Sequence, residues 1–490
     1  MHAIENDDEI QDQSESTALI PKKSQTPLPW NTMFILCLTI LSEPISLTIL
    51  FPFVYFMVKD FGLSKEEDIG YSVGFIASAF SFAQLLTSMM WGWLSDRYGR
   101  RPILLFGLIG NSVSILMFGL SKSLTWAIVS RFACGFLNGN IGVAKTVLGE
   151  ITDKSNQAKA FSLIGLNFGI GMVIGPSLGG VLANPTKTMP YLFGNIQFLE
   201  TYPYFLPCLC SAMITLVGFC VGYLFLPETC KRKLAESSYT PIIGLNDTEV
   251  NLLDDQSTDE HEPINTEQAA TQSLATIGYK PISCAVAYLL LAFQSIVFME
   301  TFPLWAVAKP GIGLGFNIQN IGICLSSIGV FTLLSQLFIY PWLATKMSPL
   351  SIFRYPTIGL LGVFLTLPMI SAFIAPNPSL SYLLWPLLIT IMGVRSLLEP
   401  LIFTSVMLLI NNSAAEGQLG IVNGMAQGAA SFARAIGPAL GGTVWAWSIQ
   451  NNLPFPFNHV FIFTFVGIFT AILLIHAFTV LSEDEDTDNL

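Results

Sequence analysis

A short polar loop between two long apolar runs decides the fold, and it reads Gly92-Trp93-Leu94-Ser95-Asp96-Arg97-Tyr98-Gly99-Arg100-Arg101-Pro102. Gly99 permits a tight turn because glycine has no side chain. Gly92 is expected to let the end of one helix pack closely against a neighbour. Asp96 can complement a helix N-terminus and pair with the nearby arginines. The three arginines are typical of a loop held on the cytosolic side of a membrane.

Apolar runs of membrane-spanning length extend outward from this loop along the chain. Of the 490 residues, 52% are hydrophobic and 11% are charged, and the mean hydropathy is +0.60. Soluble domains carry about 25% charged residues, and a helix needs about 20 apolar residues to cross a bilayer. We therefore predict an all-α membrane protein with twelve transmembrane helices, near residues 33–58, 69–91, 103–121, 124–147, 160–183, 203–226, 282–306, 319–344, 356–375, 381–410, 419–448 and 458–480.

Polar segments divide these runs into two groups of six. Residues 1–30 are predicted to be a disordered cytosolic tail, residues 228–280 a disordered acidic linker, and residues 482–490 an acidic cytosolic tail. Two six-helix bundles, residues 31–227 and 281–481, then form the membrane part. The formal net charge of −11 lies mostly in the tails and linker, and without a basic stripe we expect no nucleic-acid binding.

Lysine and arginine predict the orientation, because cytosolic loops carry an excess of these cations. If the spans alternate, most cations fall on one side of the membrane: Lys22, Lys23, Arg97, Arg100, Arg101, Lys231, Arg232, Lys233, Lys346 and Arg354. Both termini and the linker are therefore predicted to be cytosolic. In the N-terminal tail, Glu15-Ser16-Thr17-Ala18-Leu19-Ile20 has the form of an acidic dileucine sorting signal. It favours a vacuolar membrane, with the plasma membrane as the alternative.

The two groups of spans repeat one another. Three pairs of features recur at offsets of 262, 264 and 257 residues: Gly175–Gly180 with Gly437–Gly442, Arg131 with Arg395, and Glu43 with Glu300. Such a repeat predicts two bundles that face each other across a central cavity, the geometry used for alternating access.

The loop at 92–102 resembles the signature that members of the major facilitator superfamily carry between helices 2 and 3. Ser42-Glu43-Pro44, Leu50 to Met57 and Glu300 to Trp305 are similar to the twelve-span drug:proton antiporter group, in its zinc-induced-facilitator-like and tetracycline-resistance-like fungal branch. The resemblance implies the major facilitator fold and a gating loop formed by Gly92, Asp96, Arg97, Gly99, Arg100 and Arg101. The alternative is an ordinary cation-rich cytosolic loop.

Glycines in the fifth span form a second motif, which comprises Gly171, Gly175, Pro176, Gly179 and Gly180. Small residues at this spacing let helix backbones approach, and the proline bends the helix. The motif is similar to one found in the antiporters of the superfamily, which implies exchange. The alternative is a packing motif without mechanistic direction.

Ionisable residues inside the spans are costly to bury and are candidates for function. Glu43, Arg131 and Glu300 are the predicted proton-coupling residues, because a carboxyl group balanced between burial and an opposing arginine can load and release a proton. The resemblance likewise links Arg131 to proton transfer. Arg395 and Glu399 are secondary candidates. They are four residues apart on one helix, so we favour mutual neutralisation over function.

These features predict a secondary active transporter that moves a small molecule through a lipid bilayer by alternating access, in exchange for protons. The alternatives are a proton-independent facilitator or symporter and a non-transporting membrane receptor. No phosphate-binding loop, nucleophile elbow or metal constellation occurs in the sequence. We therefore expect no enzymatic activity, no cofactor and no metal, and a protein that acts as a monomer.

Overall fold

The structure, a computed structural model, describes residues 26–62, 68–152, 156–230, 278–414, 419–451 and 453–481, and its regular elements are helices. Residues 1–25 of the predicted N-terminal tail, with the sorting signal, most of the linker and the C-terminal tail lie outside the described residues, and Trp30 already begins α1. The helices up to residue 225 are α1 (Trp30–Ile40), α2 (Ser42–Thr48), α3 (Val54–Asp60), α4 (Ile69–Tyr98), α5 (Arg100–Gly119), α6 (Leu124–Phe136), α7 (Asn140–Ile151), α8 (Gln157–Leu182), α9 (Pro185–Thr188), α10 (Pro190–Phe193), α11 (Gln197–Thr201) and α12 (Phe205–Phe225).

The helices after the linker are generally longer. They are α16 (Tyr279–Val307), α17 (Ile318–Leu334), the π-helical turn η3 (Ser335–Ile339), α18 (Tyr340–Ala344), α19 (Pro349–Met369), the π-helical turn η4 (Ile370–Ile374), the 3₁₀ turn η5 (Pro378–Leu380), α20 (Ser381–Ser413), α21 (Leu419–Gln450) and α22 (Phe461–Thr479).

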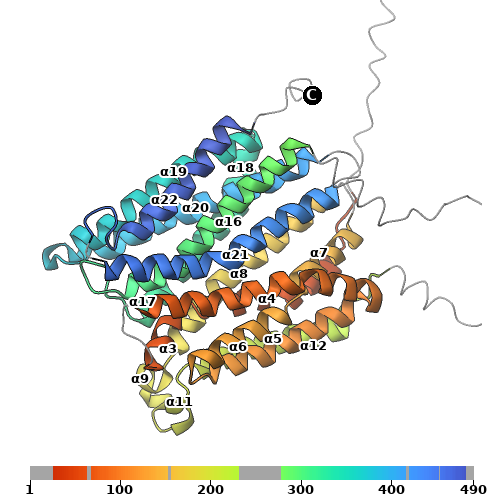
Figure 1. Ribbon diagram of the computed structural model, residues 1–490. Helices are drawn as coiled ribbons and strands as arrows, with labels where there is room; N and C mark the ends of the chain where they lie inside the picture. Colours follow the sequence, from red (N-terminus) through yellow and green to blue (C-terminus); the bar gives the residue numbers. More distant parts are fainter. Residues whose placement is uncertain are drawn as a thin grey trace, which may run out of the picture.

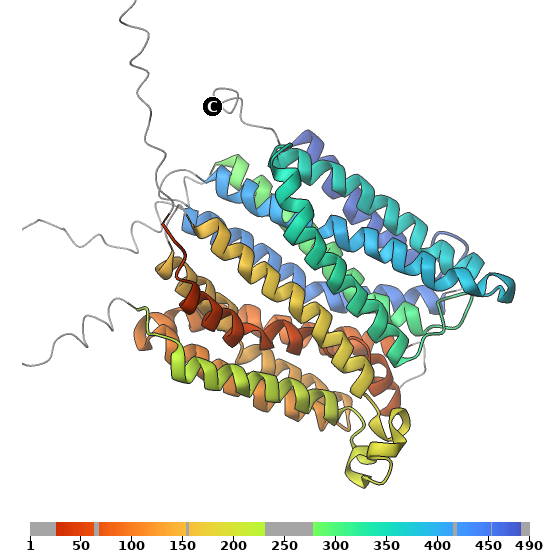
Figure 2. The same ribbon diagram turned by 180° about the vertical axis from the view of Figure 1, so that it is seen from behind.

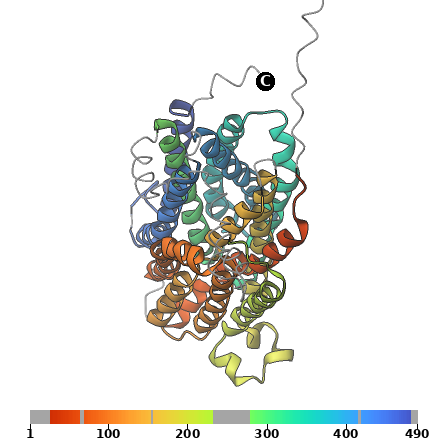
Figure 3. The ribbon, with the colours of Figure 1, turned by 90° about the vertical axis from the view of Figure 1, so that its right-hand side faces the viewer.

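The helices form two bundles that lie side by side. Those of residues 30–225, the first half, lie together in one bundle, and those of residues 279–479, the second half, in the other (Figures 1 and 2). Seen from the side, the two bundles remain separate groups (Figure 3). The helices α4 and α8 of the first half pack against α21 and α17 of the second. We call the end where α4 joins α5 the Gly99 end, and the end that carries α9 the Pro185 end.

Ten helical segments of the described residues are long and apolar enough to cross a membrane. The two other predicted spans differ from this pattern. The helix α21 has 32 residues but includes Arg434 and several glycines, so it is less apolar. The predicted span 124–147 is divided into α6 and α7, with residues 137–139 outside both helices. A protein interior tolerates such a break where a side chain satisfies the freed backbone groups.

Trp91 supplies that side chain at the break between α6 and α7. Its indole Nε1 donates a hydrogen bond of 2.8 Å to the carbonyl oxygen of Phe136, the last residue of α6. Gly139 lies directly against the indole ring. The first predicted span, 33–58, is likewise divided among α1, α2 and α3. Pro52 lies in the second of these breaks, and a proline lacks the N–H that continues a helix.

Glycines hold the two halves together near the Pro185 end. A Cβ atom on Gly74 of α4 would lie 2.5 Å from the carbonyl oxygen of Pro438 in α21, and one on Gly180 of α8 would lie 2.8 Å from the Cα of Gly322 in α17. Ser177 and Ser326 add a hydrogen bond of 2.7 Å between α8 and α17. Close backbone approach through small residues is the usual way that helices associate within a membrane.

The sequence repeat is also a repeat of contacts. Gly175 and Gly179 of α8 pack against α2, whereas the next residue, Gly180, packs against α17 in the other half. At the repeated positions, Gly437 and Gly441 of α21 pack against α16, and Gly442 packs against α4. Each repeated glycine cluster therefore touches the first helices of its own half and one helix of the opposite half.

Candidate functional site

The turn at Gly99 is fixed by backbone conformation and by a carboxylate. Gly99 has φ of 100°, a conformation that residues with a side chain rarely adopt. Glu228, just after α12, accepts hydrogen bonds from the backbone N–H groups of Arg100 at 2.8 Å and of Arg101 at 3.2 Å. A carboxylate at this place satisfies the free N–H groups and the positive end of the α5 dipole.

The arginines of the predicted gating loop bind within the first half. Arg100 forms an ion pair of 3.0 Å with Glu150 near the end of α7 and donates to Ser95 Oγ at 2.8 Å. Arg101 donates to the Tyr223 carbonyl oxygen of α12. Arg97 lies over the Trp93 ring, 5.4 Å from its centroid. The side chain of Asp96 lies outside the described part of the structure.

The close packing expected at Gly92 is absent. A Cβ atom built there would meet nothing within 4 Å. The physical reason is the separation of the helices at the Gly99 end. Gly142 and Gly149 on α7, and Gly424 and Gly428 on α21, likewise have no neighbour within 4 Å of a built Cβ. The halves thus meet closely at the Pro185 end and are less closely packed around these glycines toward the Gly99 end, where Lys145 of α7 still reaches Gln427 of α21.

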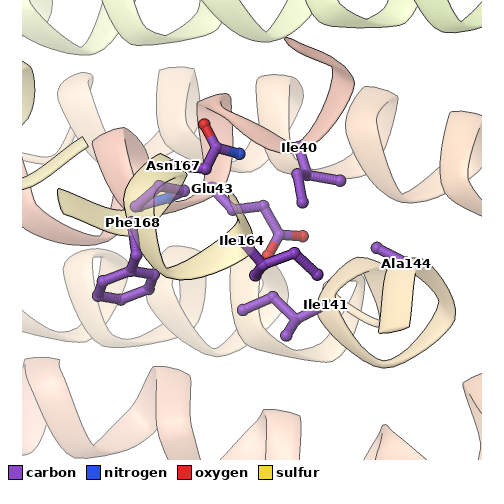
Figure 4. Close-up of a pocket in the computed structure, with 8 residues that line it drawn as sticks. Ile40, Glu43, Ile141, Ala144, Ile164, Asn167 and Phe168 are labelled. Carbon is purple, nitrogen blue, oxygen red and sulfur yellow. The ribbon is translucent and has the colours of Figure 1, made fainter. Parts of the chain in front are cut away.

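Glu43 lies on α2 and is buried, with 4% of its surface exposed. Neither carboxylate oxygen has a hydrogen-bond partner within 3.5 Å among the described residues, and the Asn140 amide of α7 is a polar group close to it. The carboxylate lines a cavity of about 40 Å³ with Ile141 and Ala144 of α7 and Asn167 of α8 (Figure 4). A water molecule needs about 10–15 Å³. The predicted proton-coupling carboxylate therefore borders a mostly apolar space that has the volume of a water molecule.

Arg131 and Glu300 act on each other electrostatically across the boundary between the halves. Arg131 lies on α6 and Glu300 on α16, and both are buried, with 2% and 5% of their surfaces exposed. They form no ion pair within 4 Å. Instead, the guanidinium of Arg131 lies over the Phe80 ring of α4, 4.6 Å from its centroid, and two of its nitrogens lack hydrogen-bond partners in the described structure.

Three buried side chains, those of Cys134, Asn111 and Ser46, form a chain of hydrogen bonds within the first half. Cys134, one turn after Arg131, is within electrostatic range of both Arg131 and Glu43. Its thiol donates to Asn111 Oδ1 at 3.1 Å, and Asn111 Nδ2 donates to Ser46 Oγ at 3.1 Å. This chain joins α6, α5 and α2, and so links the helix that carries Arg131 with the helix that carries Glu43.

Arg395 and Glu399 form the expected ion pair on α20, at 2.8 Å. The Arg395 guanidinium also lies 4.1 Å from the Phe298 ring centroid of α16. The two side chains thus neutralise each other within α20, and a structural role for the pair stays a prediction. The glycine motif of α8 also makes packing contacts, with Gly171 against Pro44 of α2.

Sequence reasoning missed several polar residues that the fold brings into contact. Glu150 and Glu228 anchor the loop at Gly99, as described above. Between the halves, Lys145 Nζ of α7 donates a hydrogen bond of 3.3 Å to Gln427 Oε1 of α21. The signal for Lys145 was present, because it is an ionisable residue inside a predicted span. Among the described residues, no three His, Cys, Asp or Glu side chains come together as metal ligands.

Comparison with known proteins shows a family model, relatives and a solved structure to which this chain is similar. A model of the Major Facilitator Superfamily matches residues 36–438. Protein ZINC INDUCED FACILITATOR 1 of Arabidopsis thaliana is 31% identical over 455 residues, which cover 90% of this chain and 90% of that protein. The multidrug transporter mfsB of Aspergillus fumigatus is 29% identical over 487 residues, covering 86% and 80%. A solved D-xylose-proton symporter has the same fold, with a TM-score of 0.69 at 13% identity over 93% of this chain and 98% of that one.

Proposed function

This chain belongs to the major facilitator superfamily, and from that membership we propose that it exchanges a small molecule for protons by alternating access. The membership confirms the family and the fold class predicted from the loop at 92–102. It also makes the chain a multi-pass membrane protein related to transporters rather than to enzymes. The cargo, the proton coupling and the direction are the parts that we propose.

The observation that supports the proton coupling is the burial of Arg131 and Glu300, which come from opposite halves and each have polar atoms without a hydrogen-bond partner in the described structure. Burying a charge without a partner is costly, so each group depends on compensation from the other half. When the halves rock, the separation of the two groups changes, and with it the free energy of holding a proton on the Glu300 carboxylate.

Glu43 is the second carboxylate in the proposal. Its oxygens are buried without a hydrogen-bond partner within 3.5 Å in the described structure, and the cavity beside them has the volume of a water molecule. The two halves are less closely packed toward the Gly99 end, which we propose to be the cytosolic end on the basis of the cations in the loops. Protons would then leave Glu43 toward the cytosol in this state. We further propose a vacuolar membrane, with both termini in the cytosol.

The experiment that tests this function measures proton flux in proteoliposomes that hold a pH gradient. An interior pH dye reports the gradient while amino acids, polyamines, drugs and carboxylates are added one class at a time. Antiport predicts that one class dissipates the gradient and that Glu300→Gln abolishes this effect. Cargo uptake that proceeds at the same rate with and without the gradient would instead establish a proton-independent facilitator. No flux for any class would support a non-transporting receptor.

A further inference from the structure

Two cations from opposite halves come near one another where the halves separate. Lys145 is on α7 of the first half and contacts Gln427 on α21 of the second half, and Arg434 follows Gln427 two turns later on the same face of α21, so the two like charges lie near enough to repel each other. Lys145 Nζ donates to Gln427 Oε1, as noted above. Arg434 Nε donates to the Ala430 carbonyl oxygen at 3.3 Å, which draws the guanidinium back along α21 toward the turn that carries Gln427.

Neither cation has an acidic partner in the described part of the chain. The ion pairs there join Arg100 with Glu150 and Arg395 with Glu399. The hydrogen-bond partners of Lys145 and Arg434 are a neutral amide and a backbone carbonyl. Half-buried cations that lie inside a transporter without a counter-charge are costly, and they usually mark a path for a charged ligand. The charge that is missing between them is negative.

Lys145 and Arg434 have no charged counterparts at the equivalent positions of the other half. With the offset of the glycine motif, 262 residues, the position equivalent to Arg434 is Met172. With the offset of the matched arginines, 264 residues, the position equivalent to Lys145 is Leu409. The glycine clusters, which pack the helices together, do repeat, and so do the matched residues Arg131 and Arg395. A charge present in one half alone is better explained by what the protein binds.

The surroundings of the cations are open to a ligand. Gly142 and Gly149 lie on the same face of α7 as Lys145, and Gly424 and Gly428 flank Gln427 on α21. None of the four has an atom within 4 Å of a built Cβ. Tyr288 of α16, within electrostatic range of the Arg434 guanidinium, packs edge-on against the Phe403 ring, with centroids 6.1 Å apart. Aromatic side chains therefore lie near the second cation.

We propose that Lys145 and Arg434 bind the negatively charged group of the cargo, and that the cargo is a small organic carboxylate. This inference names the substrate of the proposed transporter and rests on that function. A carboxylate between the two cations contacts both halves at once and replaces their repulsion with two attractions. A ligand shifts a conformational equilibrium only by its differential affinity for the two states. The bound anion thus favours the state in which the halves approach at the Gly99 end.

Binding is tested on the purified full chain by thermal unfolding. The probes are aliphatic and aromatic mono- and dicarboxylates, each matched with its uncharged amide. At least one carboxylate is expected to raise the melting temperature while its amide does not. Lys145→Gln and Arg434→Gln should each weaken its Kd by about tenfold or more. Lys145→Arg should retain most of the affinity, and Lys187→Gln, which removes an exposed cation at the Pro185 end, should leave the Kd unchanged.

The proposal is overturned if no carboxylate raises the melting temperature, or if an amide does so as well as its acid. Because this comparison uses the unaltered protein, it stands even where a variant fails to fold. Full affinity for the carboxylate in a folded Lys145→Gln, Arg434→Gln double variant would also overturn it.

Transport assays distinguish a failure of this inference from a failure of the proposed function. Carboxylate uptake that needs Lys145 and Arg434 but ignores a pH gradient would refute proton exchange and leave the anion site standing. Proton flux driven at the wild-type rate by neutral or cationic compounds in the double variant would refute the anion site and leave proton exchange standing.

Discussion

At the scale of single residues, the matched carboxylates Glu43 and Glu300 have different surroundings. Glu43 borders a cavity within the first half, whereas Glu300 interacts with Arg131 across the boundary between the halves. The sequence repeat placed the two acids at equivalent positions, yet the charge that compensates Glu300 comes from the other half. We therefore expect the two carboxylates to have distinct roles in the transport cycle.

Glu43→Gln and Arg131→Ala are predicted to abolish proton-coupled transport while the protein still inserts and folds. The glutamine keeps the shape of Glu43 but cannot exchange a proton. The alanine removes the charge that faces Glu300, and a loss of at least about tenfold in coupled flux is expected, equivalent to about 1.4 kcal/mol. Proton flux in proteoliposomes measures the effect.

The control for both variants is Glu200→Gln, which changes an exposed carboxylate on the short helix α11. It should transport at the wild-type rate. Full coupled flux in both Glu43→Gln and Arg131→Ala would remove these residues from the proton pathway.

At the scale of elements, the start of α5 depends on Glu228. The carboxylate accepts hydrogen bonds from the backbone N–H groups of Arg100 and Arg101, and also from those of Thr229 and Cys230. Glu228→Gln keeps one acceptor oxygen but loses the charge that faces the helix dipole. We expect a loss of about 1 kcal/mol in stability, seen as a lower melting temperature of the purified protein. An unchanged melting temperature would show that the cap contributes no net stability.

The contact between α4 and α21 gives a matched pair of glycine substitutions. Gly74→Ala places a methyl group against the Pro438 carbonyl oxygen, so α4 and α21 must separate, at a cost of about 1–3 kcal/mol. Gly92→Ala on the same helix meets nothing within 4 Å and should be neutral or slightly stabilising. Thermal unfolding and transport are measured for both. Equal behaviour of the two variants would mean that the glycine contact does not hold the halves together.

At the scale of the whole molecule, the two ends should differ in accessibility. Gly142→Cys and Gly428→Cys lie on the separated faces, and Ser326→Cys lies in the contact between α8 and α17. In a background without the eight native cysteines, an impermeant maleimide should label the first two at least about tenfold faster, because buried groups react only after opening. Added carboxylate should slow the labelling of Gly142→Cys and Gly428→Cys if it draws the halves together. Rapid labelling of Ser326→Cys would instead indicate that the Pro185 end is open.

Much of this architecture could be predicted from sequence because apolar length and repeated motifs are local signals. The loop at 92–102, the glycine clusters and the Arg395–Glu399 pair all depend on residues close together in the chain. The break at residues 137–139 could not be predicted, because Trp91, which satisfies the freed Phe136 carbonyl, is 45 positions away from it. The proximity of Lys145 and Arg434 could not be predicted either, since the two residues lie on helices from different halves and their separation depends on how far the halves are apart.

The glycine contacts near the Pro185 end also determine the mechanics of the molecule. From Gly442 to Gln427 the helix α21 runs about 22 Å, at 1.5 Å per residue. With the glycine contact as a pivot, this length is a lever arm, and a tilt of about 5° displaces Gln427 by about 2 Å. That displacement is enough to break its hydrogen bond of 3.3 Å to Lys145. A small rotation about a tight fulcrum thus opens or closes the far end, and neither bundle has to deform.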